Sequence, residues 1–110
     1  MDFQLDYDMD VQNNRWNVTL AGEIDIFDSP ELKARLTALL EEKDADLYLQ
    51  CKNLEYIDST GLGALVGVLK TVNSNGREMH LISIKPNIQK LFKITNLDKV
   101  FILEDGVDNG

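Results

Sequence analysis

The 110-residue sequence predicts an α/β domain, with a mixed sheet of four to five strands and helices packed mainly on one face. Three observations support this fold class. The first residues alternate between apolar and polar side chains, as does a strand with one buried and one exposed face. Two later segments repeat apolar residues at helical spacing. Each segment is followed by a short apolar run, and strands separated by helices imply right-handed crossovers within one sheet. We expect residues 1–110 to form a single domain.

The chain is expected to begin with a β-hairpin. Apolar and polar residues alternate from Phe3 to Val11, and the alternation resumes at Trp16. The intervening "QNNR" contains adjacent asparagines, which tolerate the positive φ angles of a tight turn. The apolar side of the first strand comprises Phe3, Leu5, Tyr7, Met9 and Val11.

A first helix is expected to begin within "DIFDSPEL", residues 25–32. Asp28 or Ser29 can accept hydrogen bonds from free backbone N–H groups, and Pro30 suits a first helical turn. Asp28 and Glu31 also have the spacing of a capping box. The apolar stripe of this helix comprises Leu32, Leu36, Leu39 and Leu40.

Strands and helices are expected to alternate along the rest of the chain. A short strand at 46–51 precedes "YIDSTGLGAL" (56–65), which leads through a loop into a second helix ending near Gly76. The run "EMHLISI" (78–84) predicts a strand buried on both faces. Pro86 begins a third helix, Asn96 ends it, and "KVFIL" (99–103) adds a short edge strand. The stripe of the second helix comprises Leu62, Leu65, Val66, Leu69 and Val72.

Composition excludes several classes of function. A net charge of −8 argues against nucleic acid and against anionic membrane surfaces. The same acidity suits a basic protein partner, and it also serves solubility. No apolar run is long enough to cross a bilayer, and the first residues are acidic where a signal peptide is basic. A single cysteine fits a reducing, cytoplasmic setting.

The residues that most often carry catalysis are poorly placed for it. The only histidine, His80, lies inside an expected strand, and Cys51 ends a buried one. The sequence has no metal-ligand spacing and no nucleophile elbow, and "DSTGLG" lacks the lysine of a phosphate-binding loop. We therefore expect neither an enzyme nor a metal or cofactor site.

The segment around Ser59 presents hydroxyls at the start of a helix. A helix cap is the ordinary explanation for Ser59 or Thr60. Gly61 and Gly63 each cost about 0.5–1 kcal/mol relative to alanine inside a helix. They leave a surface without side chains, which Gly67 continues, across which a second protein can approach Ser59. Close packing against a neighbouring strand is the alternative explanation.

A phosphate on Ser59 would be stabilised by free N–H groups and by the positive end of the helix dipole. It would add about −1.5 to −2 charges beside Asp58 on an acidic molecule. Such a modification should change association with a partner and leave the fold intact.

Four segments together resemble the anti-sigma factor antagonists of bacteria, single-domain STAS proteins that control sporulation and general-stress sigma factors. They are "GEID" (22–25), "DSPEL" (28–32), "IDSTGLGAL" (57–65) and "LFKITNLDKVF" (91–101). The resemblance covers nearly the whole chain. It implies that Ser59 is phosphorylated by a partner anti-sigma factor that is itself a serine kinase. The unphosphorylated antagonist binds the anti-sigma factor and frees the sigma factor, and a PP2C-type phosphatase restores it.

The same resemblance assigns roles to residues around Ser59. Asp25 lies in a loop near the phosphoserine and helps contact the kinase, and a solvated loop carboxylate is the alternative explanation. Asp58 shapes the loop before the acceptor, and Thr60 caps the helix while remaining the alternative acceptor. Asp28 departs from the smaller or less acidic residue typical of the family. The expected partner-binding residues are Asp25, Asp58, Thr60, Gly61, Leu62 and Gly63.

Two other hypotheses use the same residues. A phosphoryl carrier or small nucleotide-binding protein would hold phosphate at the same helix start. A STAS adaptor would keep the fold and serve another bacterial complex, such as a stress-signalling or lipid-transport assembly. We expect the free chain to be a monomer, since no large apolar face remains after the helices are packed.

Overall fold

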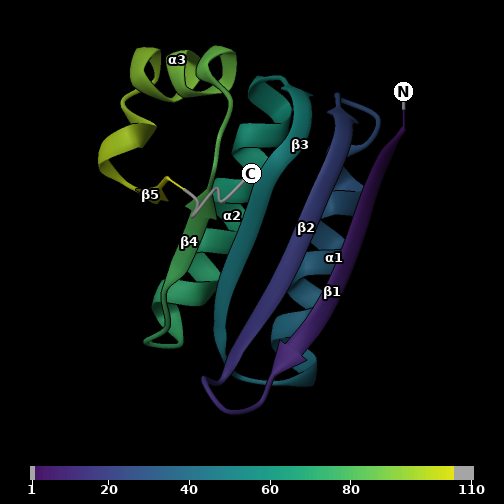
Figure 1. Cartoon of the computed structure of the whole chain (residues 1–110), viewed down its shortest axis with the longest axis vertical. Coiled ribbons are helices and arrows are strands. Elements are labelled where there is room, and N and C mark those ends of the chain that lie inside the picture. Colours follow the sequence, from purple (N-terminus) through teal and green to yellow (C-terminus); the bar gives the residue numbers. More distant parts are fainter. Residues whose placement is uncertain (1, 106–110) are drawn as a thin grey trace.

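The computed structural model describes residues 2–105 and shows a five-stranded mixed sheet (Figure 1). The strand order is β1-β2-β3-β4-β5; β1 is antiparallel to β2, and the other neighbours are parallel. This confirms the predicted fold class. The strands are β1 (Phe3–Asp10), β2 (Arg15–Ile24), β3 (Asp46–Ile57), β4 (Met79–Ile82) and β5 (Ile102–Glu104). The helices are α1 (Ser29–Glu42), α2 (Ser59–Ser74) and α3 (Pro86–Ile94), with a 3₁₀ turn at Leu97–Lys99.

The predicted hairpin is confirmed, with β1 paired to β2 from Phe3–Gly22 to Asp10–Arg15. Two residues expected on its buried side are exposed, however. Val11 lies beyond the strand, in the turn, and Tyr7 packs edge-on against Trp16 with ring centroids 5.8 Å apart. Because β1 is the edge strand, the helical layer covers Leu5 but leaves Tyr7 open to solvent.

The outward polar side of β1 carries carboxylates. Asp6 and Asp8 are both exposed, and they alternate with the apolar residues that face the helices. Within residues 2–105, β1 has a neighbouring strand on one side only, so this row of negative charge runs along an edge strand of the sheet.

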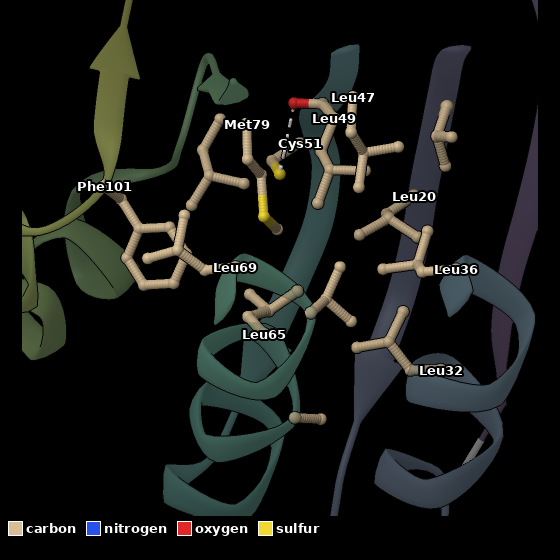
Figure 2. Close-up of a cluster of buried hydrophobic side chains, with 14 of the residues drawn as sticks. Leu20, Leu32, Leu36, Leu47, Leu49, Cys51, Leu65, Leu69, Met79 and Phe101 are labelled. Atoms are coloured by element: carbon tan, nitrogen blue, oxygen red, sulfur yellow. Dashed lines mark hydrogen bonds between the residues drawn. The ribbon is translucent and has the colours of Figure 1, made fainter. Parts of the chain in front are cut away.

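The two longest helices, α1 and α2, lie side by side on one face of the sheet (Figure 1). Figure 2 shows Leu32 and Leu36 of α1 and Leu65 of α2 pointing toward the leucines of β2 and β3. Leu32 and Leu36 have no exposed surface, and truncating such a side chain to alanine typically costs about 2–5 kcal/mol. The stripe predicted for α1 is thus its buried face.

The third strand is six residues longer than predicted and runs to Ile57 instead of residue 51. Two shifts in the β2–β3 register, next to Ala21 and Gly22, keep the strands paired as far as Ile24 and Ile57. Gly22 has φ +93°, and a Cβ there would collide with the carbonyl oxygen of Asp2. Because β3 extends so far, Asp58 alone separates it from α2.

The C-terminal part of the described chain follows the predicted order. Pro86 begins α3, Ile88 and Phe92 are buried, and Asn96 adopts a left-handed conformation with φ 60° just after the helix. Gly76 has φ +71° after α2, as a left-handed cap does. Within residues 2–105, no helix combines the length and apolar character needed to cross a membrane.

His80 is a structural residue of the sheet, as its place in a strand predicted. Its ring stacks on Tyr48 with centroids 4.2 Å apart and is 8% exposed. The two ring nitrogens lie 2.7 Å from Glu104 Oε1 and 3.1 Å from Glu78 Oε1. Both nitrogens are therefore occupied by neighbouring carboxylates.

The glycines of α2 generate a stability prediction with an internal control. A Cβ at Gly61 would collide with Ile57 Cγ1, and it would lie 2.8 Å from Ile57 Cδ1 and 3.3 Å from Ile24 Cγ2. A Cβ at Gly63 would meet nothing within 4 Å. We expect Gly61→Ala to lower the free energy of unfolding by about 1–3 kcal/mol through overpacking, and Gly63→Ala to raise it by about 0.5–1 kcal/mol. Urea unfolding measures both; equal shifts would contradict the packing role of Gly61.

The buried thiol generates a second prediction. Burial raises the pKa of Cys51 to about 12, and its Sγ lies 3.6 Å from the carbonyl oxygen of Leu49 (Figure 2). Because the thiolate is the reactive form, the folded chain should react with a thiol reagent at pH 8 at least roughly 100-fold more slowly than the chain in urea. The rate of labelling, followed by mass, tests this. Equally rapid labelling without urea would mean that the thiol is accessible.

Candidate functional site

Two connections meet at the carboxyl ends of β2 and β3. The parallel strands pair up to Ile24 and Ile57, and the N–H of Asp58 donates to the carbonyl of Ile24 at 3.3 Å. The β2–α1 connection and the start of α2 therefore lie together at one end of the sheet (Figure 1). Functional groups gather at this edge in open α/β sheets.

Asp58 caps α2. Its Oδ1 accepts from the N–H groups of Thr60 and Gly61 at 3.0 and 3.1 Å, and from the Thr60 hydroxyl. The N–H of Leu62 bonds to the Asp58 carbonyl at 3.0 Å. The cap was expected at Thr60 and is Asp58 instead, because a carboxylate in extended backbone reaches both N–H groups. Of the N–H groups expected to be free for a phosphate, those of Thr60 and Gly61 are already occupied.

Ser59 and Thr60 differ sharply in their surroundings. Ser59 is the first residue of α2 and is exposed, and its hydroxyl makes no hydrogen bond to the part of the chain that the structure describes. The Thr60 hydroxyl donates to Asp58 and lies 3.0 Å from Ser29 Oγ. Of the two candidate acceptors, both exposed, the Ser59 hydroxyl is the one that makes no hydrogen bond to the described chain.

Ser29 joins the two connections, a role that sequence reasoning missed. It was one of two candidate caps for α1, but its side chain makes no cap bond and is 6% exposed. Its Oγ lies 2.8 Å from the carbonyl of Asp25 and 3.0 Å from Thr60 Oγ1. Because Thr60 gives its proton to Asp58, the single proton of Ser29 goes either to Asp25 or to Thr60. Spacing along the sequence contains no signal for this contact across 31 residues.

The β2–α1 connection is held by two carboxylates. Asp25 Oδ1 accepts from the N–H groups of Phe27 at 2.9 Å and Asp28 at 3.3 Å, and Asp28 Oδ2 accepts from the N–H of Asp25 at 3.2 Å. The predicted capping box of Asp28 with Glu31 is wrong. The reciprocal pair lies three residues earlier because residues 26–28 already form a turn, with Ser29 N–H bonded to the Asp25 carbonyl at 3.0 Å.

The ionisation of Asp25 supports this turn. Burial acts to raise the pKa of its carboxyl, but hydrogen bonds from the Phe27 N–H and from Asp28 outweigh that effect, so the pKa lies below its ordinary value. A lowered pKa in the folded state means that the turn is stabilised at neutral pH. This contribution is lost only as the pH falls through the lowered pKa.

The partner surface expected at the start of α2 is narrower in the structure. Gly61 is buried against Ile57, and Leu62 is 2% exposed, so neither reaches the surface as expected. Close packing against the strands accounts for a glycine at position 61, whereas a Cβ at Gly63 would meet no atom within 4 Å. The surface without side chains does not continue to Gly67, because the end of the Lys33 side chain lies 2.9 Å from the position of a Cβ there.

Asp58 holds two of the N–H groups that a phosphate could bind at the start of α2, those of Thr60 and Gly61. Within residues 2–105, no group of three or more histidine, cysteine, aspartate or glutamate residues is arranged to hold a metal ion. What the site presents is one uncovered hydroxyl beside a fixed carboxylate.

The sequence matches a family model and a curated protein over nearly its whole length. The family model of the STAS domain matches residues 6–110. The anti-sigma-B factor antagonist of Staphylococcus aureus (strain NCTC 8325 / PS 47) is 34% identical over 104 residues, which cover 94% of this chain and 96% of the relative.

Solved structures show the same fold. An anti-sigma factor antagonist from Mycobacterium paratuberculosis superposes with a TM-score of 0.83 at 20% identity, covering 98% of this chain and 90% of that one. The Bacillus cell fate determinant SpoIIAA in its phosphorylated form gives a TM-score of 0.72 at 20% identity, covering 96% of this chain and 93% of that one. The chain therefore belongs to the anti-sigma factor antagonist family, which is built on the STAS domain.

Proposed function

We propose that this chain binds an anti-sigma factor in its unphosphorylated form, so that a sigma factor is released, and that phosphorylation of Ser59 by that same anti-sigma factor ends the binding. The observation that carries the proposal is the exposed, unbonded hydroxyl of Ser59 beside the fully engaged hydroxyl of Thr60. A kinase can reach the first without breaking any hydrogen bond of the fold.

The electrostatics of the turn support a switch in binding. A phosphate on Ser59 adds about −1.5 to −2 charges next to the Asp58 carboxylate. Because Asp58 holds the N–H groups of Thr60 and Gly61, these two donors are not free to pair with the phosphate, and Ser59 itself is exposed at the surface. A partner seated there must then desolvate a dianion, which is costly unless a cation pairs with it.

The surface around Ser59 gives each neighbouring residue a role. Asp58 and Asp25 are half-buried and fix the two connections, while Thr60 and Gly63 are exposed beside the acceptor. Gly63 leaves room for a second protein to approach along α2. In this proposal Asp25 acts mainly by holding its turn, which presents the neighbouring residues to the kinase.

We further propose that the chain works as a single STAS domain, a cytoplasmic monomer when free. Its partners are the anti-sigma factor serine kinase and a PP2C-type phosphatase that removes the phosphate. It acts without catalysis, metal or cofactor of its own, and without contacting nucleic acid or membrane.

The acceptor is tested by the cognate kinase and ATP, with intact-mass and fragment mass spectrometry. We expect one phosphate on the wild-type chain at Ser59, none on Ser59→Ala, and one at Ser59 on Thr60→Val. The last variant removes the hydroxyl bonded to Asp58 but leaves the acceptor in place. A phosphate on Thr60 would overturn the assignment.

The switch is tested by the affinity for the anti-sigma factor. Ser59→Ala should bind like the wild type, because the hydroxyl makes no bond to the described chain. The phosphorylated chain and Ser59→Asp should bind at least about tenfold more weakly, which corresponds to about 1.4 kcal/mol. Calorimetry measures all three, with circular dichroism as the control for folding. Equal affinities would contradict a switch at this residue.

A further inference from the structure

The turn that faces the Ser59 site exposes two adjacent apolar side chains. Phe27 is 86% exposed, more than any other large hydrophobic residue within residues 2–105, and Ile26 is 59% exposed. Single exposed apolar residues are ordinary, but an exposed aromatic beside an exposed isoleucine is a common feature of protein interfaces. Neither side chain belongs to the hydrophobic core.

The backbone that carries Phe27 is already ordered. Its N–H donates to Asp25 Oδ1 at 2.9 Å, and the reciprocal bond from Asp25 N–H to Asp28 Oδ2 closes the turn at 3.2 Å. A partner that takes up the Phe27 ring therefore does not have to order this backbone first. Preorganisation of this kind lowers the entropic cost of association.

The turn is continuous with the site of modification. Ser29, two residues after Phe27, lies 3.0 Å from the hydroxyl of Thr60, which is next to Ser59. The N–H of Asp58 bonds to the carbonyl of Ile24, two residues before Ile26. A protein whose active site reaches Ser59 is therefore close enough to contact this turn as well.

We propose that Phe27, assisted by Ile26, is the apolar anchor with which the anti-sigma factor kinase holds this chain while its active site reaches Ser59. The proposal rests on the function proposed above. The occupant that fits offers an apolar pocket bordered by cationic side chains, because the Asp25 and Asp28 carboxylates belong to the same turn as Phe27 and Asp58 directly precedes Ser59. In this proposal the kinase recognises the Phe27 ring by its shape and the nearby carboxylates by their charge.

The charges disfavour other occupants of this surface. A second copy of the chain, with its own net charge of −8, would bring the same carboxylates against one another. An anionic lipid surface would be repelled for the same reason. A basic protein partner is the occupant that satisfies both the apolar ring and its acidic surroundings.

The test compares Phe27→Ala with Val11→Ala in a binding and phosphorylation assay with the purified anti-sigma factor kinase of the same organism. Val11 is 82% exposed but lies in the β1–β2 turn, at the opposite end of the sheet, and serves as the matched control (Figure 1). We expect Phe27→Ala to raise the Kd and the KM for phosphorylation by at least roughly tenfold, with kcat nearly unchanged. Phe27→Leu should recover most of the affinity, and Val11→Ala should match the wild type.

The outcomes separate the anchor from the switch. Wild-type binding and phosphorylation by a Phe27→Ala chain with an unchanged melting temperature would overturn the anchor and leave the Ser59 switch intact. Failure of the wild-type chain to bind the kinase or accept phosphate would overturn the proposed function and the anchor with it. A photo-cross-linking residue at position 27, and not at position 11, should attach to the kinase; the reverse pattern would also overturn the anchor.

Discussion

The parallel pairing of β2 with β3 through their last residues is the constraint on which the site depends. Because Ile24 and Ile57 are partners and Asp58 N–H continues the ladder, the two following connections emerge side by side. The short turn into α2 leaves no length of chain to separate them. This pairing brings together Ser29 and Thr60, which are 31 residues apart in the sequence. The carboxylates of Asp25 and Asp58 belong to the same hydrogen-bonded unit.

Within this unit the carboxylates and hydroxyls have different tasks. Asp58 accepts hydrogen bonds from the N–H groups at the start of α2, and Asp25 accepts them from N–H groups of the turn before α1. Their negative charge is thus committed to structure, and in the proposed function the change of charge at the surface comes from a phosphate on Ser59. Because the groups that hold the fold are separate from the group that is modified, phosphate addition can change what associates with the chain and leave its packing alone.

Much of the fold could be predicted from periodicity and from a few special residues. The hairpin, the stripes of α1 and α2, the start of α3 at Pro86 and the left-handed Gly76 all follow from local patterns. The end of β3 could not be predicted, because "KNLEY" breaks the alternation that marks a strand. Exposure of Tyr7 depends on how far the helical layer reaches across the sheet, which is a tertiary property.

The candidate site was predictable in position but only partly in detail. The motif places Ser59 at a helix start, yet the choice of Asp58 as the cap, and of Asp25 with Asp28 as the reciprocal pair, depends on backbone angles one to three residues away. Gly61 and Gly63 look equivalent in the sequence, but Gly61 faces the strands and Gly63 faces solvent. The hydroxyl contact between Ser29 and Thr60 joins two helices, and no pattern within either helix reports it.

The acidic row along β1 has a consequence for how the chain behaves at high concentration. An unpaired border strand is a template on which identical molecules can polymerise through their backbones. Where two copies pair β1 against β1, Asp6 and Asp8 bring like charges together, which disfavours that pairing. The charged side chains on β1 thus act against self-association through the border of the sheet.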